Sequence, residues 1–313
     1  MPTFSTAVVA AITAERDGLQ RVELDNGRRA YVLTQLIGPV ATGDCVVVNT
    51  TAVDLGLGTG GWDVVHWNLS REGWSAPGGG LVMKLRYTSL QVDTGVAEED
   101  GPTPAEDLGG RPVVACDVHS QLAPVAVAFA DVAPDRRLSF VMTDSAALPI
   151  ALSDLVAELQ GRDLLHETIT CGQAFGGDRE AVNVPSALLL ATGDAVVVAP
   201  GPGVVGTGTR LGFSSLEMAS VIDMVAVLGG RPIVAVRHST SDARARHRGR
   251  SHHTTTVLAT AMYEALAPEP EDGWAGPAMN FEVTTMGRSP GEDPEFFRYA
   301  GAAGRAAAQL LVS

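Results

Sequence analysis

The pattern of hydrophobic and polar positions divides the chain into two parts. Up to about residue 97, short β-prone runs are separated by turn signals such as "RDGL" and "DNGR", and the Asn-Gly step at 26–27 is a strong hairpin signal. Further strands are expected around residues 45–49 and 63–69. Many short strands of this kind favour a small β-rich domain, a barrel or a sandwich, over residues 1–97.

A strand pair is also expected in "GLVMKLRYTSLQVDTGV". Lys84 and Arg86 alternate on one face of it, so we expect both side chains to point to solvent. The acidic, Pro- and Gly-rich stretch "AEEDGPTPAEDLGGRP" then interrupts the pattern, and residues 98–111 are expected to be a linker between domains.

From residue 112 onward the rhythm changes. Near-continuous apolar runs such as "PVVACDVHS", "RLSFVMTDS", "DAVVVAPGPG" and "RPIVAVRHS" alternate with segments of helical character. Strands of this composition are buried on both faces, which is typical of a parallel sheet covered by helices. The sequence therefore predicts an α/β domain over residues 112–313, with a mainly parallel sheet and helices on both faces.

Parallel sheets bind ligands at the carboxyl ends of their strands. Polar or glycine-rich clusters follow the predicted strands at residues 119–120, 143–145, 171–172, 201–208 and 237–239. All five clusters are expected at one edge of the sheet.

Composition limits the classes of function. The chain of 313 residues is 45% hydrophobic, so we expect it to be globular. Its formal net charge of -14 argues against a nucleic-acid partner and against adhesion to an anionic membrane. No run approaches the length of a membrane span, and the amino-terminal residues lack the basic region of a secretory signal. Three widely spaced cysteines without a metal-binding spacing are typical of a reduced, cytoplasmic protein.

The loop "APGPGVVGTGTRLGF" follows a predicted strand and precedes a predicted helix. Glycines in this position let backbone N–H groups approach an anion closely, although the loop matches neither a Walker loop nor a dinucleotide fingerprint. A tight strand exit without any ligand is an equal alternative. If the loop does bind a ligand, the residues expected to do so are Gly203, Gly206, Thr207 and Gly208.

The most unusual segment is "RHSTSDARARHRGRSHHTTTVL", beginning at Arg237, which is basic within an acidic chain. Ser251 is a plausible N-cap, so His252 and His253 are expected in the first turn of a helix, where further positive charge is unfavourable. Asp242 is the one acid within the segment. The crowding of cations at this point favours an anion held among them.

Three interpretations of this segment remain open. In the first, Arg237, Arg244, Arg246 and Arg250 hold a phosphate- or carboxylate-bearing small molecule, and a histidine acts as general acid or base. In the second, a metal-dependent hydrolase uses Asp242, His247, His252 and His253 as ligands or catalytic groups, although their spacing matches no metal motif. In the third, the protein is a non-catalytic scaffold, and the segment forms an interface between copies of the chain in a homo-oligomer. The sequence identifies no cofactor and no reaction.

Four segments together resemble one protein family: "MKLRYTSLQ", "GPGVVGTGTRLGF", "RHSTSDARARHRGRSHHTTT" and "VTTMGRSPGEDPEFF". They are similar to an uncharacterised bacterial family, common in actinobacteria, that is defined as a domain of unknown function. The resemblance spans nearly the whole chain. It implies no activity, substrate or cofactor.

Overall fold

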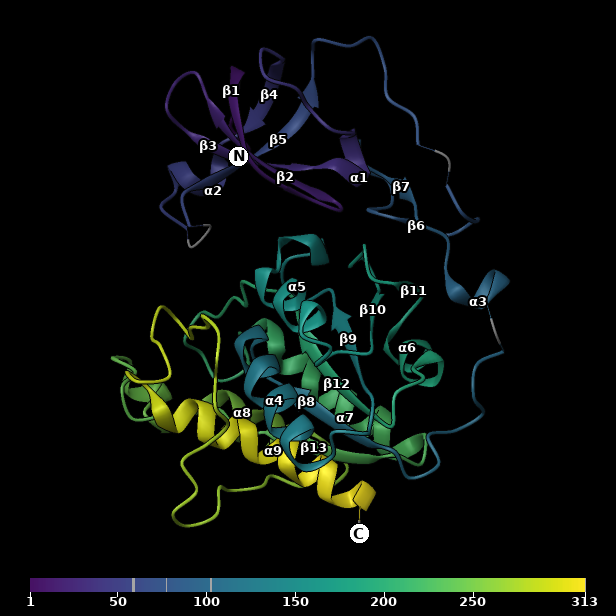
Figure 1. Ribbon diagram of the computed structural model, residues 1–313, viewed down its shortest axis with the longest axis vertical. Coiled ribbons are helices and arrows are strands. Elements are labelled where there is room, and N and C mark those ends of the chain that lie inside the picture. Colours follow the sequence, from purple (N-terminus) through teal and green to yellow (C-terminus); the bar gives the residue numbers. More distant parts are fainter. Residues whose placement is uncertain (58–59, 77, 102, 313) are drawn as a thin grey trace. The chain divides into compact units, whose positions relative to one another are not determined.

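The computed structural model describes residues 1–57, 60–76, 78–101 and 103–312. The chain divides into two compact units, Met1–Gly95 and Val96–Ser313. The first unit is β-rich and the second is α/β (Figure 1), which confirms the predicted fold class.

The first unit is built around a closed barrel with the strand order β1-β2-β3-β5-β4. Neighbouring strands run antiparallel, except that β3 and β5 are parallel. Its elements are β1 (Phe4–Arg16), β2 (Leu19–Leu24), β3 (Arg29–Leu33), α1 (Thr34–Ile37), β4 (Cys45–Asn49), α2 (Thr51–Asp54), β5 (Trp62–Asn68), β6 (Met83–Lys84) and β7 (Val92–Asp93). Alternating residues of the strands, among them Val22, Val32 and Val46, fill the barrel interior.

Two local predictions from the sequence can be compared with the structure of this unit. The predicted hairpin at the Asn-Gly step is present between β2 and β3, and Gly27 takes the left-handed φ of 78° that such a turn requires. The expectation that Lys84 faces solvent is wrong, because its side chain is only 1% exposed whereas Met83 is 41% exposed. Arg86 is exposed, as expected. The alternation of faces does not extend from Lys84 to Arg86, because β6 ends at Lys84 and Leu85 has a left-handed φ of 52°.

The second unit contains a six-stranded sheet with the order β11-β10-β9-β12-β8-β13. Every neighbouring pair is parallel. Its strands are β8 (Pro112–Cys116), β9 (Leu138–Thr143), β10 (Glu167–Cys171), β11 (Arg179–Ala181), β12 (Ala195–Pro200) and β13 (Arg231–Ala235). All residues of β8, β9, β10 and β12 are buried, which explains the largely apolar sequences of β8, β9 and β12. The buried strand β10 is an exception in composition, because it contains Glu167, Thr168 and Thr170.

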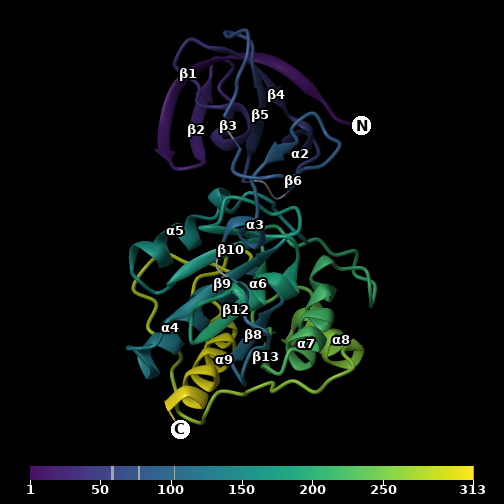
Figure 2. The ribbon, with the colours of Figure 1, turned by 90° about the vertical axis from the view of Figure 1, so that its right-hand side faces the viewer.

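Helices cover both faces of this sheet (Figure 2). One core cluster joins the sheet to α4, α5 and α9, and a second cluster joins its other face to α6, α7 and α8. The helices of the unit are α3 (Ala97–Asp100), α4 (Leu122–Val132), α5 (Asp154–Gly161), α6 (Val184–Leu190), α7 (Met218–Val227), α8 (His252–Thr260) and α9 (Pro294–Val312), with the 3-10 turns η1 (His119–Gln121), η2 (Ile150–Leu152), η3 (Ser214–Glu217) and η4 (Ala245–His247). A small antiparallel ribbon of β14 (His238–Ser239) and β15 (Gly249–Arg250) follows β13.

The carboxyl-terminal helix α9 approaches α4 very closely. Gly304 of α9 is buried, and a Cβ atom at this position would lie 2.1 Å from the carbonyl oxygen of Val125 in α4. Small residues such as Ala303 and Ala307 continue the same contact surface. The Ala- and Gly-rich composition of the last segment therefore serves a close helix contact over one face of the sheet.

Residues 103–111, part of the stretch that the sequence suggests as a linker, belong to the second unit. Leu108 is 3% exposed and lies in the core cluster beneath α7. Backbone hydrogen bonds from Leu108 to Leu228 and from Gly110 to Gly229 tie this segment to the turn before β13.

Candidate functional site

The carboxyl edge of the parallel sheet gathers the residues that follow three neighbouring strands. Asp117 follows β8, Gly201 follows β12 and Arg237 comes shortly after β13. Parallel sheets bind ligands at this edge, because the loops that leave it converge there. The glycine-rich loop and the basic segment, defined here as residues 201–213 and 237–253, both start from it.

A buried hydrogen-bond chain fixes the start of α8 against the ends of β8 and β13. The hydroxyl of Thr254 donates to Oδ2 of Asp117 at 2.6 Å and accepts the backbone N–H of Arg237 at 3.0 Å. Asp117 is 1% exposed, and burial raises its pKa to about 6. Its second oxygen, Oδ1, is buried without a hydrogen-bond partner in the described part of the chain.

Helix α8 begins where the sequence predicts. Ser251 is its N-cap, and the Ser251 hydroxyl accepts a hydrogen bond from the backbone N–H of His253 at 3.2 Å. The same hydroxyl is hydrogen-bonded to Nδ1 of His247 at 2.8 Å. One capping side chain therefore also positions a histidine from the preceding loop beside the first turn of the helix.

His247, His252 and His253 form a compact group. Each offers one atom that could bind a metal, and these atoms lie within 4.8 Å of one another. The rings of His252 and His253 are 4.5 Å apart between centroids, and both lie about 5 Å from the ring of His247. Nε2 of His252 is buried and has no hydrogen-bond partner among the residues that the structure describes.

The surroundings of all three imidazoles favour their neutral form. Burial and then the positive charge of Arg237 lower the pKa of His247 and the pKa of His253 to about 3. Burial and then Arg246 lower the pKa of His252 as well. Neutral imidazole is the form that ligates metal ions.

The glycine-rich loop lies against this group. Phe213 stacks on the ring of His253, with centroids 3.9 Å apart and ring planes within 6°. A Cβ atom built at Gly206 would lie 3.7 Å from Nε2 of His253, and one at Gly208 would lie 3.6 Å from the guanidinium carbon of Arg246. The structure thus brings together the two segments that the sequence places at the same sheet edge.

Two other residues predicted in the loop shape its backbone. The N–H of Thr207 donates to the carbonyl oxygen of Gly212 at 2.8 Å, which closes a turn. Gly203 has a left-handed φ of 92°, a conformation that favours glycine. A Cβ atom at Gly203 would meet nothing within 4 Å.

Asp242 does not join the three histidines. Its carboxylate is 2% exposed and accepts hydrogen bonds of 3.0 and 2.8 Å from Nε and Nη2 of Arg244. Guanidinium nitrogens of Arg288 and Arg237 lie 3.5 and 3.8 Å from Oδ2. Although burial opposes it, hydrogen bonding by Arg244 holds the pKa of Asp242 well below its ordinary value. Asp242 therefore balances arginine charge in this structure. Among the described residues, the group that could hold a metal consists of the three histidines without it.

The predicted arginines have different surroundings. Arg237 is 3% exposed, and its Nη1 lies 3.4 Å from Nδ1 of His253. Arg250 lies on β15 and pairs with Glu269 at 3.2 Å. Arg246 is exposed, and in the described part of the chain no acidic side chain lies within ion-pair distance of it.

Several residues of the site lack a strong local signal in the sequence. Asp117 directly follows β8 and could have been found by the strand-end rule, which pointed instead to the next polar pair. Asp293 and Arg288 come from the segment before α9, and Asp293 accepts hydrogen bonds from Arg288 at 3.0 Å and from Ser239 at 2.7 Å. Thr254 is one of three consecutive threonines. Only the packing of the chain shows which threonine faces Asp117.

Two polar residues that follow strands of the sheet, His119 and Asp144, are hydrogen-bonded to neighbouring loops. The ring of His119 lies between the carbonyl oxygen of Pro200 at 2.9 Å and the hydroxyl of Ser153 at 2.6 Å, and burial lowers the pKa of His119 to about 4. Asp144 accepts the backbone N–H of Gln173 at 2.8 Å. Both residues tie neighbouring loops together.

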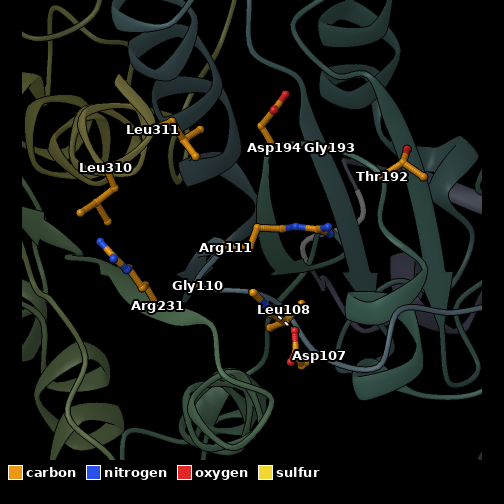
Figure 3. Close-up of a pocket in the computed structure, with 11 residues that line it drawn as sticks. Asp107, Leu108, Gly110, Arg111, Thr192, Gly193, Asp194, Arg231, Leu310 and Leu311 are labelled. Atoms are coloured by element: carbon orange, nitrogen blue, oxygen red, sulfur yellow. Dashed lines mark hydrogen bonds between the residues drawn. The ribbon is translucent and has the colours of Figure 1, made fainter. Parts of the chain in front are cut away.

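A pocket of about 600 Å³ lies at the opposite, amino edge of the sheet (Figure 3). Figure 3 shows Arg111 extending toward Thr192 and Arg231 extending toward Leu310, from the starts of two neighbouring strands. Arg111 donates a hydrogen bond of 2.5 Å to the carbonyl oxygen of Ala191. The guanidinium of Arg111 thus binds backbone.

These features define a class of protein: a β-barrel unit joined to an α/β unit, with a cluster of histidines and arginines at the carboxyl edge of a parallel sheet. The chain belongs to the family described as "Protein of unknown function (DUF3866)", which matches residues 29–271. No curated protein matches the chain.

Within the residues that the structure describes, no helix is both long enough and apolar enough to cross a membrane.

Proposed function

We propose that this protein binds a small anion bearing a phosphate or carboxylate group between the glycine-rich loop and the basic segment. The observation that carries the proposal is the position of Arg246. Its guanidinium lies beside Gly208 and near the histidine group, and in the described chain it has no acidic partner. A guanidinium recognises phosphate and carboxylate through paired hydrogen bonds, so an anion is the natural partner at this position.

The balance of charge around the histidines supports an anion as well. Arg237, Arg244 and Arg288 share the single carboxylate of Asp242, and Arg288 also reaches Asp293. The amino end of the nine-residue helix α8 adds the positive end of its dipole. An anion bound here would relieve the repulsion among these groups.

The low pKa values limit what the histidines do in this function. Imidazoles with a pKa of about 3 carry no charge near neutral pH, so they offer hydrogen bonds and lone pairs. Recognition of charge then rests on the arginines. The proposal is accordingly a binding function, and it assigns no reaction.

The experiment compares thermal melts in phosphate and in chloride at equal ionic strength. A specific ligand stabilises the folded state by mass action, by about 2.7 kcal/mol when its concentration is one hundred times the Kd. General screening affects both salts alike. We expect phosphate to raise the Tm of the wild type and Arg246→Ala to abolish that rise.

The matched control is Arg136→Ala, at the amino edge of the sheet, where Arg136 pairs with Asp194 at 3.3 Å. This variant should keep the full response to phosphate. Equal melts in phosphate and chloride, or a response that survives Arg246→Ala, would refute the proposal. If the melts in phosphate and chloride are equal, a molecular mass that rises with protein concentration would favour the alternative, a scaffold that self-associates through the basic segment.

A further inference from the structure

We propose that His247, His252 and His253 together bind one divalent transition-metal ion of the zinc type, with an open coordination position that faces the anion site. The three potential ligand atoms already lie within 4.8 Å of one another. Zinc–nitrogen bonds are about 2.0–2.1 Å long, so two nitrogens on the same zinc ion lie about 3–3.5 Å apart. Small side-chain rotations would therefore close the group around a metal.

A buried nitrogen without a hydrogen-bond partner among the described residues also supports a metal site. Nε2 of His252 is buried and has no hydrogen-bond partner in the described part of the chain. Leaving a buried polar atom unsatisfied is costly, and native proteins rarely do so without a ligand, an ion or a water molecule. A metal ion bound to this nitrogen would satisfy it.

The remaining contacts orient the other two rings. The Ser251 hydroxyl is hydrogen-bonded to Nδ1 of His247, which leaves Nε2 of that ring for a metal. Phe213 stacks on His253 and fixes the plane of its ring. Partners that orient ligating histidines are a regular part of metal sites in proteins.

The type of ligand selects the class of metal. Three imidazoles suit zinc, cobalt, nickel and copper, whereas magnesium and calcium prefer oxygen ligands. Three protein ligands also leave a tetrahedral ion with one free position, as in catalytic rather than structural zinc sites.

The surrounding arginines make metal and anion binding depend on each other, and this part of the inference rests on the proposed function. Arg237 approaches His253 to 3.4 Å, so a divalent cation on the histidines would be repelled by its guanidinium. An anion between the metal and the arginines removes that repulsion. By linkage, the metal must then strengthen anion binding by the same factor as the anion strengthens metal binding.

The metal site is tested by titrating zinc into metal-free full-length protein in a calorimeter, and cobalt(II) in a spectrophotometer. We expect one zinc per chain and the intense visible bands of tetrahedral cobalt. His252→Ala is the main variant, because His252 is the least buried of the three and the structure gives its Nε2 no partner to lose. It should weaken zinc binding at least about tenfold, with an unchanged circular dichroism spectrum.

His247→Ala is a second variant with the same expected loss. The matched control is His166→Ala, which removes an exposed histidine that lies just before β10, at the amino edge of the sheet. Its zinc affinity should equal that of the wild type. Absence of zinc binding to the wild type, or equal binding in His252→Ala and the wild type, would overturn the metal site.

The coupling is tested by repeating the zinc titration with and without sulfate, and by titrating sulfate into chelator-treated and zinc-loaded protein. Sulfate is the probe because zinc phosphate precipitates. Coupled sites predict that sulfate tightens zinc binding about fivefold or more. Zinc affinity that does not change with sulfate overturns the coupling. If sulfate binds in neither state while zinc still requires His252, the metal site stands and the proposed anion function fails.

Discussion

The contact between α9 and α4 permits a sharp test of how this fold is held together. We consider Gly304→Ala, a substitution that adds one methyl group at the point where the two helices are closest. The added Cβ atom would lie 2.1 Å from the carbonyl oxygen of Val125 and 2.9 Å from its carbonyl carbon. Both atoms belong to the backbone, so no change of rotamer can relieve the overlap. The helices must separate by about 1 Å to restore an ordinary contact distance.

Two effects of opposite sign decide the result. Alanine is favoured over glycine within a helix by about 1 kcal/mol. Overpacking in a well-filled core costs about 1–3 kcal/mol, and a backbone overlap belongs at the upper end of that range or above it. We expect a net loss of about 2 kcal/mol in the free energy of unfolding, which corresponds to a Tm lower by about 4–8 °C for a unit of this size.

The chain offers a matched control in Gly161→Ala. Gly161 ends α5, and a Cβ atom there would meet nothing within 4 Å. The same substitution should therefore raise the free energy of unfolding by about 0.5 kcal/mol, through a smaller loss of chain entropy. The assay is urea unfolding followed by helical circular dichroism, with thermal melts alongside. If Gly304→Ala is as stable as the wild type or more stable, the close approach of α9 and α4 does not exist as described.

Three further predictions concern single side chains. Burial lowers the pKa of His119 from 6.5 to about 4, so its contribution to stability is present above pH 6.5 and is lost as the pH falls toward 4. The loss should reach about 3 kcal/mol. His119→Asn should remove that part of the pH dependence when urea unfolding is measured at a series of pH values, and an equal dependence of stability on pH in variant and wild type would contradict the prediction. Asn183 caps α6 by accepting the N–H of Ser186 at 2.9 Å, so Asn183→Ala should lower the free energy of unfolding by about 1 kcal/mol, and a calorimetric Tm equal to that of the wild type would refute this capping role. In the barrel, Asp63 is 2% exposed and accepts hydrogen bonds of 2.6 and 2.8 Å from Arg28. Asp63→Ala should destabilise the first unit by about 2 kcal/mol, as measured by tryptophan fluorescence during unfolding. A variant as stable as the wild type would show that this ion pair contributes little.

The sequence predicted the fold well because the relevant signals are local. An apolar run that is buried on both faces looks different from an alternating one, and the runs that became β8, β9, β12 and β13 needed no knowledge of their partners. The cap at Ser251 was equally local, since a serine before a helix satisfies an N–H two residues away. Lys84 shows the limit of such signals, because a two-residue strand carries too little pattern to fix its phase.

The candidate site was predicted only in its position. A parallel sheet brings its strand exits to one edge whatever their side chains are, so the glycine-rich loop and the basic segment were expected to meet, and Gly206 and His253 do. The local pattern could not show that Arg250 would find Glu269, or that Arg246 would be left without an acid in the described chain. Those outcomes depend on where later segments pack.

The sequence by itself therefore determined the two-part architecture, the sheet edge and the helix start, because each follows from the order of residues along a few turns or strands. Only the tertiary structure decided the chemistry at that edge. It placed Asp117 on Thr254 across 137 positions of the chain, and it paired Asp242 with Arg244 and Arg288. It also stacked Phe213 on His253. Contacts between residues far apart in the chain depend on how whole elements pack, and burial in that packing is what sets the charge of the three imidazoles.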